Sequence, residues 1–160
     1  MIIMASLFMA SCQLKTSVAP VDLTAAKEDV TKLLDKFHAG MISQDANALI
    51  TLFTDDCLAC GTDSKELLNK ADWNKMLTQA FADTTLKMNF TIDKRDIRIS
   101  KDGKAAVALE QAFINSFSEK MPCRFVYHAV KNDSGWQLDF MSVSFIPNNE
   151  DLAKLNKALE

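Results

Sequence analysis

Histidine and cysteine, the side chains that most often bind zinc, are scarce in this sequence. It contains 2 histidines and 4 cysteines among 160 residues, and only Cys57 and Cys60 have the C-x-x-C spacing of a zinc half-site. No second such pair and no regularly spaced histidines accompany them, whereas a structural zinc site needs four ligands. The sequence therefore predicts no metal site, and nothing in it indicates a bound cofactor.

The C-x-x-C segment also lacks the setting of a redox motif. Reactive pairs lie where a strand meets the N-terminus of a helix, which lowers the pKa of the first thiol, but Cys57 and Cys60 stand in the apolar run "CLAC" before Gly61. Residues three apart in a strand point to opposite faces. We expect two small strand residues, and a disulfide from one of them to Cys123 is an alternative if the protein is exported.

The sequence has no basic excess and no long apolar run. Its 18 Lys and Arg residues face 21 Asp and Glu residues, for a net charge of -3. This balance leaves no positive field to hold a polyphosphate backbone, so nucleic acid is excluded as the expected partner. No apolar stretch reaches the roughly 18 residues that a membrane-spanning helix needs. The length and composition fit one globular domain.

The first twelve residues, "MIIMASLFMASC", form an apolar run that ends in small residues and a cysteine. Met9-Ala10-Ser11-Cys12 resembles the lipobox of bacterial lipoprotein signals, in which the cysteine is acylated. The resemblance implies a signal over residues 1–12, a tether over 13–23 and a single domain over 24–160. It also implies a lipid anchor at Cys12 as the only membrane contact, in the bacterial cell envelope, periplasmic or on the outer surface. The alternative is an apolar N-terminus or an element of the fold, in a cytoplasmic protein.

Hydrophobic periodicity predicts helices in the first half of the chain. Apolar residues at helical spacing predict one helix over about residues 24–42, with Asp22 or Thr24 as its N-cap. A short helix is expected after Asp45, and a further helix over about residues 70–82. The segment "DDCLACG" between them is predicted as a short strand, followed by a helical turn at Ser64.

The period changes to that of strands in the second half. Alternating patterns predict strands over 87–100, 105–117, 123–131 and 136–146, and "SKDGK" and "KNDSGW" have the residues of hairpin turns. A last helix is expected to follow Asn148 or Asn149. Helices followed by a meander of antiparallel strands indicate an α+β fold.

Four stretches carry a family resemblance: "SQDANALITLFTDD", "CGTDSKELLNKADWNKML", "KDGKAAVALE" and "GWQLDFMSVSF". Together, and in this order, they resemble the nuclear transport factor 2-like superfamily, in its SnoaL-like or ketosteroid-isomerase-like branch. The resemblance implies a cone-shaped half-barrel, with a strongly curved, mostly antiparallel sheet wrapped around N-terminal helices, plus an extra C-terminal helix. It also implies a cavity between sheet and helices, and a convex face that often pairs with a second copy, hence a homodimer.

Each predicted strand has two faces, and the resemblance suggests which one lines the cavity. We expect the Trp136 side of the last strand to face inward, while Glu110, Tyr127 and Asp139 point away. His38, on the first helix next to Phe37, is expected to be a flanking residue without a role in the site. A single bulge would reverse this assignment. The residues predicted to bind a ligand are Arg124, His128, Gln111, Ser142, Trp73, Trp136 and Phe140.

Three functions are compatible with this pattern. The leading hypothesis is a non-catalytic domain that binds a small apolar or amphipathic molecule in the cavity. The first alternative is an isomerase, cyclase or hydro-lyase, which needs an acid and a proton donor in a dry pocket. Tyr127 and Asp139 are predicted to point away, whereas His128, on the predicted inward face, is a candidate general base. The second alternative is a dimerising interaction module, motivated by Met141, Val143 and Phe145 on the predicted outer face.

Overall fold

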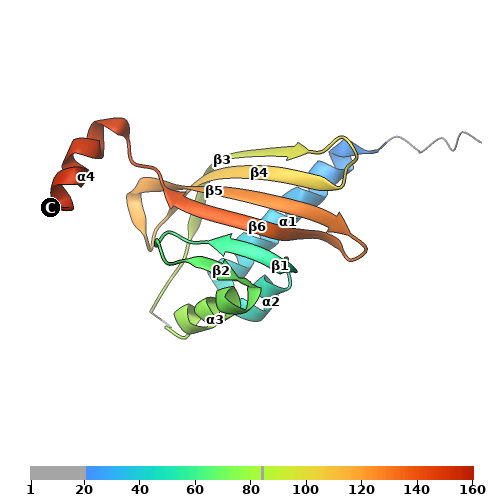
Figure 1. Cartoon of the computed structure of the whole chain (residues 1–160), viewed down its shortest axis with the longest axis horizontal. Coiled ribbons are helices and arrows are strands. Elements are labelled where there is room, and N and C mark those ends of the chain that lie inside the picture. Colours follow the sequence, from blue (N-terminus) through green and yellow to red (C-terminus); the bar gives the residue numbers. More distant parts are fainter. Residues whose placement is uncertain (1–20, 84) are drawn as a thin grey trace, which may run out of the picture.

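The structure is a computed structural model that describes residues 21–83 and 85–160. The predicted signal with Cys12 and most of the predicted tether lie outside the described residues. Figure 1 shows the elements, which are α1 (Leu23–Ser43), α2 (Ala46–Ile50), β1 (Phe53–Cys60), β2 (Leu67–Asn69), α3 (Lys70–Phe81), β3 (Phe90–Ile99), β4 (Ala105–Ile114), β5 (Ser118–Asn132), β6 (Gly135–Phe145), a 3-10 turn (Asn149–Asp151) and α4 (Leu152–Ala158).

Side-chain caps fix where the helices begin, as the sequence predicts. Asp22 accepts hydrogen bonds from the backbone N–H groups of Thr24 and Ala25 at the start of α1. Asp45 accepts one from Ala48 at the start of α2. These contacts satisfy N–H groups that have no partner inside a helix, so the capping residues set the helix boundaries.

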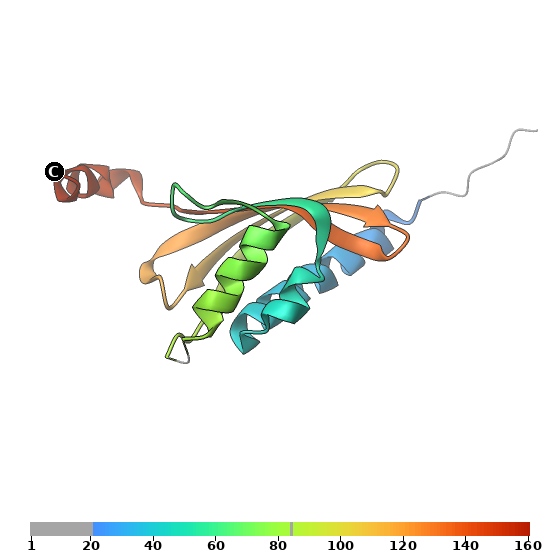
Figure 2. The same ribbon diagram turned by 60° about the horizontal axis from the view of Figure 1, so that its bottom comes forward.

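The strands form one mixed, curved and unclosed sheet in the order β2-β1-β6-β5-β4-β3. β1 runs parallel to β6, and all other neighbours are antiparallel. Figure 2 shows α1, α2 and α3 on one face of this sheet; no described helix covers the other, outer face. The expected α+β architecture, a curved sheet around N-terminal helices with an extra C-terminal helix, is confirmed.

Two short segments differ from the expectation or add to it. A turn does occur at Ser64, but it leads into β2, whose three residues are too few to show an alternating pattern in the sequence. α4 has no buried residue and lies beyond the end of the sheet (Figure 1). Among the described residues, none of the helices has the length and apolar character needed to cross a membrane.

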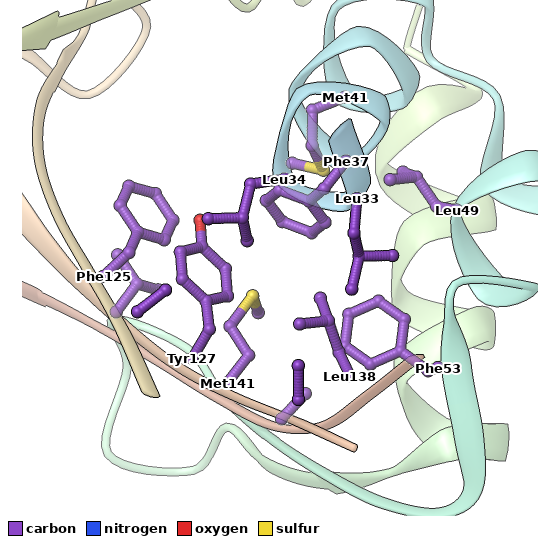
Figure 3. Close-up of a cluster of buried hydrophobic side chains, with 14 of the residues drawn as sticks. Leu33, Leu34, Phe37, Met41, Leu49, Phe53, Phe125, Tyr127, Leu138 and Met141 are labelled. Carbon is purple, nitrogen blue, oxygen red and sulfur yellow. The ribbon is translucent and has the colours of Figure 1, made fainter. Parts of the chain in front are cut away.

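The core lies between α1 and the covered face of the sheet. Leu34 and Phe37 of α1 point toward Tyr127, Leu138 and Met141 of the sheet (Figure 3). Burying each such side chain contributes about 1.5–3 kcal/mol. The apolar stripe predicted for α1 is buried throughout and comprises Ala26, Val30, Leu33, Leu34, Phe37 and Met41.

A bulge in β6 exchanges its two faces partway along the strand. β6 pairs Phe140 with His128 but Leu138 with Ala129, so Asp139 is an extra residue. Leu138 before the bulge is buried, and so is Met141 after it. The single inward face predicted for this strand is therefore correct as far as Leu138 and wrong from Phe140 onward.

The face assignment for β4 and β5 is wrong along both strands. Glu110 and Tyr127, predicted to point outward, are fully buried beneath the helices. Alternation correctly separates the two faces, but it does not tell which face the helices cover. The buried residues are Ala106, Ala108, Glu110, Ala112 and Ile114 on β4 and Cys123, Phe125, Tyr127 and Ala129 on β5.

The cysteines behave as strand residues. Cys57 is buried. Cys60, three positions later in β1, is only half-buried and lies on the opposite face of the strand. Cys57, Cys60 and Cys123 are free thiols. Burial raises the pKa of the Cys57 and Cys123 thiols, which makes both poor nucleophiles.

Candidate functional site

An apolar cavity of about 100 Å³ lies between α1, α3 and the covered face of the sheet. Thr62 and Glu66, in the connection between β1 and β2, are polar residues at its edge. The exposed residues Thr62 and Phe117 show where the cavity reaches the surface. Its aromatic and methionine walls are Phe37, Phe81, Phe90, Phe117, Phe125, Met41, Met76, Met88 and Met141.

Trp73 of α3 lines this cavity, as the sequence predicts. The residue is only 4% exposed, and Phe53 packs against the indole edge-to-face with ring centroids 6.3 Å apart. Its Nε1–H is buried and has no acceptor among the described residues. A buried indole N–H normally finds a partner, so Trp73 is an exception within the core.

Most other predicted site residues lie on the outer face of the sheet. The register pairs Gln111 with Arg124 and His128 with Phe140, so the sequence correctly groups these side chains on shared faces. The face they share is the outer face, not the covered face that was predicted. The bulge at Asp139 places the end of β6 this way round, and on β4 and β5 the face predicted to be inward is the outer one. The predicted ligand-binding residues that the structure places there are Arg124, His128, Gln111, Ser142 and Phe140.

Polar contacts on the outer face satisfy these side chains mutually. His128 Nδ1 lies 2.6 Å from Asp139 Oδ1, so Asp139 points outward as predicted, whereas His128 lies outward against the prediction. Gln111 donates to Asp93 at 3.0 Å, and Arg124 donates to Gln111 at 3.5 Å. These residues are therefore surface strand residues rather than cavity walls.

Trp136 is also away from the cavity. It lines a separate groove beside the β5–β6 hairpin, with Lys32, Lys36 and Lys131. Lys131 Nζ lies 5.9 Å from the centroid of the Trp136 ring. Of the two tryptophans, only Trp73 reaches the cavity.

A buried polar network connects α1 to the sheet through one carboxylate. Glu110 is 0% exposed, and its Oε2 lies 2.6 Å from His38 Nε2 and 3.2 Å from the Tyr127 hydroxyl, which donates to it. Its Oε1 accepts from Arg95 Nε at 2.5 Å. Arg95 Nη1 donates in turn to Asp35 at 2.7 Å. Donors from α1, β3 and β5 thus converge on a single side chain of β4.

The partners of Glu110 determine its charge. Burial raises the pKa of Glu110, but the hydrogen bonds and positive charges of His38 and Arg95 outweigh burial and leave this pKa below its ordinary value. Burial, reinforced by the Glu110 charge, raises the pKa of Tyr127 well above its ordinary value. At neutral pH Glu110 is therefore a carboxylate, which can only accept, so His38 Nε2 and Tyr127 both carry the donated hydrogens.

His38 borders the cavity from behind its aromatic wall. Its ring lies 4.8 Å from Phe90 and 6.2 Å from Phe125, measured between centroids, and both phenylalanines line the cavity. His38 Nδ1 is buried without a partner among the described residues. Nε2 carries the hydrogen donated to Glu110, so Nδ1 holds the lone pair whenever the ring is neutral.

The sequence contains one signal that could have located this network. Every second residue of β4 lies on the same face, and from 106 to 112 these residues are Ala106, Ala108, Glu110 and Ala112. Small residues in a strand allow a helix to pack closely, so this face is the covered one, and a carboxylate on it must be paired. The partner residues His38 and Arg95 lie far from Glu110 in sequence and carry no comparable signal.

Comparison with known proteins gives a family and a fold. A model described as the SnoaL-like domain matches residues 30–148. An NTF2-like protein of unknown function from Pseudomonas putida KT2440 shares 17% identity with a TM-score of 0.69, covering 79% of this chain and 91% of that one. A domain of unknown function with a cystatin-like fold from Nostoc punctiforme shares 15% identity with a TM-score of 0.68, covering 84% and 85%.

A proposed dehydratase of the NTF2-like family from Streptomyces avermitilis shares 14% identity with a TM-score of 0.68, covering 80% of this chain and 100% of that one. No curated protein matches the sequence at a significant level. At these identities the solved structures support the fold and say nothing of the reaction or ligand.

Replacing Glu110 with glutamine tests the buried charge. Because its pKa is lowered in the folded protein, the Glu110 charge stabilises above its ordinary pKa of about 4.3 and this stability is lost as the pH falls through the lower folded value. We expect Glu110→Gln to lower the free energy of unfolding at pH 7 by about 3 kcal/mol, and the difference to shrink toward pH 3. Urea unfolding between pH 7 and pH 3 measures both.

The matched control is Glu119→Gln, at an exposed position of β5. It should follow the parent protein at every pH, within about 0.5 kcal/mol. A Glu110→Gln difference that stays constant down to pH 3 would show that the carboxyl is not charged in the folded protein.

Proposed function

The chain belongs to the SnoaL-like domain family, and we propose that it binds a small apolar or amphipathic molecule in the cavity between α1, α3 and the sheet. The observation that carries the proposal is the lining of this cavity, in which aromatic and methionine side chains predominate. Binding sites for small molecules are typically concave and mostly apolar, with a few polar groups that set orientation. Thr62 and Glu66 at the edge are such groups.

The size of the cavity suits one ring or a short chain. An apolar cavity of about 150 Å³ in a protein is known to hold benzene, and this one is about 100 Å³. Methionine side chains are unbranched and adapt to what they contact. Met41, Met76, Met88 and Met141 can therefore move to admit a ligand somewhat larger than the cavity itself.

Filling the cavity from α3 tests this proposal. Ala80 lines the cavity, so Ala80→Leu should occupy the space and weaken the binding of α-methylstyrene by about tenfold or more, equivalent to about 1.4 kcal/mol. Isothermal titration calorimetry measures the affinity. Ala71→Leu, at an exposed position of the same helix, should leave it unchanged, and equal affinities in all three proteins would place the ligand elsewhere.

A proton-transfer enzyme is the second candidate, favoured by the His38–Glu110 pair beside the cavity. Phe90 and Phe125 stand between His38 and the cavity and would first have to move aside. The Nδ1 lone pair of His38 would then accept a proton from a carbon next to a carbonyl group, and the electron pair of that C–H bond would form the enolate. The Glu110 carboxylate would stabilise the resulting imidazolium. This arrangement replaces the Tyr127 and Asp139 pair considered from the sequence, since Asp139 lies on the outer face.

Hydrogen–deuterium exchange tests that candidate without knowledge of the natural substrate. If His38 is the base, the protein in D₂O should speed the exchange of the methyl hydrogens of acetophenone, and His38→Gln should abolish the acceleration. Proton NMR follows the methyl signal. His128→Gln, on the outer face, serves as the control and should retain full acceleration. Exchange at the buffer rate with the parent protein would refute the catalytic role.

A dimerising role is the third candidate, and the outer face of the sheet supports it. Val107 is 48% exposed and Leu109 38% exposed, both on β4. Exposed apolar side chains gathered on one face usually mark an interface. A second copy of this chain is the partner we expect there.

Sedimentation velocity over a range of concentrations tests the dimer. Leu109→Glu would place a charge in the patch opposite Asp96, so the dimer dissociation constant should rise by about tenfold or more. Lys101→Glu, in the exposed β3–β4 turn, should leave association unchanged. A parent protein that is monomeric at every concentration would contradict a dimer.

A further inference from the structure

We propose that the groove between α1 and the β5–β6 hairpin, here called the hairpin groove, binds a phosphate monoester. This site is separate from the apolar cavity, so the inference goes beyond the proposed function and does not depend on it. The observation behind it is that three lysines from two elements, Lys32, Lys36 and Lys131, line one groove together with Trp136.

The hairpin groove forms where the end of the β5–β6 hairpin lies beside α1 (Figure 2). Lys131 and Trp136 are paired across the hairpin, and the turn between them contains Gly135, whose φ of 104° favours glycine. Lys32 and Lys36 are four residues apart on α1, so they lie one turn apart on the same side of the helix. The fold therefore brings positive side chains from a helix and a strand to one concave place.

The hairpin groove is positive, although the whole chain has a net charge of -3. Its charged lining residues are the three lysines and Asp29, which gives the lining a net charge of +2. Lys32 lies 3.5 Å from Asp29, whereas neither Lys36 nor Lys131 forms an ion pair with a carboxylate of the described chain. Like charges four residues apart on a helix repel each other, so an anion bound among these lysines would remove an unfavourable interaction.

The charge and the size of the groove favour a phosphate monoester over other anions. Such a group carries a charge of about −1.5 to −2 at pH 7, which matches the lining, whereas a carboxylate would neutralise only half of it. The ammonium group of lysine binds phosphate as a point charge and requires no fixed orientation. The groove measures about 420 Å³, within the roughly 300–1,000 Å³ that is typical of ligand sites, so it also has room for the group that the phosphate esterifies.

The remaining lining of the groove suits the organic part of such a ligand. Leu33, Leu52 and Trp136 supply apolar surface next to the lysines. Lys131 Nζ lies 5.9 Å from the centroid of the Trp136 ring, so a positive charge and an apolar surface adjoin each other. A molecule that joins a phosphate to an apolar group would contact both, whereas inorganic phosphate would contact the lysines alone.

A matched pair of ligands tests the ligand class by isothermal titration calorimetry. Phenyl phosphate is a monoester, and methyl phenyl phosphate is the diester with the same ring and a single negative charge. We expect phenyl phosphate to bind the parent protein and the diester to bind about threefold to tenfold more weakly. Inorganic phosphate, which lacks the ring, should also bind more weakly. Equal affinities for the two esters would overturn the monoester assignment.

Matched variants test the site. Lys36→Gln and Lys131→Gln should each weaken the binding of phenyl phosphate by about threefold to fivefold, and the double variant by about tenfold or more. Lys75→Gln removes the same charge from an exposed position of α3 and should leave the affinity unchanged, as should Ala80→Leu, which fills the apolar cavity. An equal loss in Lys75→Gln and Lys36→Gln would show attraction to the whole protein and overturn the site. A loss in Ala80→Leu alone would move phenyl phosphate to the cavity and overturn the site as well, while leaving the proposed function intact.

Two sources carry this chemistry, a free organic phosphate and the headgroup of phosphatidic acid. Cosedimentation with phosphatidylcholine vesicles that contain either phosphatidic acid or phosphatidylglycerol, adjusted to the same surface charge, distinguishes them. A preference for phosphatidic acid that the Lys36→Gln/Lys131→Gln variant loses would support the groove with a lipid as its ligand. Binding of phenyl phosphate without this preference would support it with a soluble ligand. The absence of both would overturn the inference and leave the proposed function of the cavity untouched.

A second measurement locates the ligand in the unmodified protein. The protein has 2 tryptophans, so ¹⁵N-labelled protein gives two indole signals, which Trp136→Phe assigns. Phenyl phosphate should shift the signal of Trp136, which lines the hairpin groove, and leave that of Trp73 in place. A shift of the Trp73 signal with an unmoved Trp136 signal would contradict the inference.

Discussion

The cavity results from a mismatch between the width of the sheet and the helices that cover it. Six strands spaced about 4.8 Å apart span about 24 Å, whereas α1 and α3, the two helices that line the cavity, are each about 10 Å wide and cover about 20 Å. α1 packs on β3 and β6, while α3 packs on β1 and β2. The space between the helices is filled by long side chains, and the part they leave empty is the cavity. The proposed binding site is thus a consequence of how this fold is assembled.

Glu110 determines how α1 lies on the sheet. A buried carboxylate contributes little net stability when paired, but it is costly to leave unpaired. With Arg95, His38 and Tyr127 all directed at Glu110, α1 has one position in which all three contacts to the carboxylate form together. Apolar contacts alone would permit small slides of the helix. The network therefore fixes the cavity walls that α1 supplies, Phe37 and Met41, and holds the His38 ring against the aromatic wall.

Local features of the sequence predict most of the elements, and non-local ones do not. The periodic stripe of α1 and the caps Asp22 and Asp45 depend on neighbouring residues, so the predicted bounds of α1 agree with the structure to within one residue. The bounds of β5 do not, because this strand begins at Ser118, before the predicted start at residue 123. The covered face of the sheet depends on distant packing and on the bulge at Asp139, so Arg124 and His128 were assigned to the wrong side. Trp73 was found because α3 is strongly amphipathic. The partners of Glu110 are brought together only by the tertiary fold.

The most direct test of a ligand-binding cavity uses its methionines. Of the methionines in the described part of the chain, Met41, Met76, Met88 and Met141 line the cavity and Met121 does not. Protein labelled with ¹³C at the methionine methyl groups can be titrated with xenon, which enters apolar cavities. The account predicts shifts of the four cavity methyl signals and an unmoved Met121 signal. Cavity signals that stay fixed while xenon is added would contradict it.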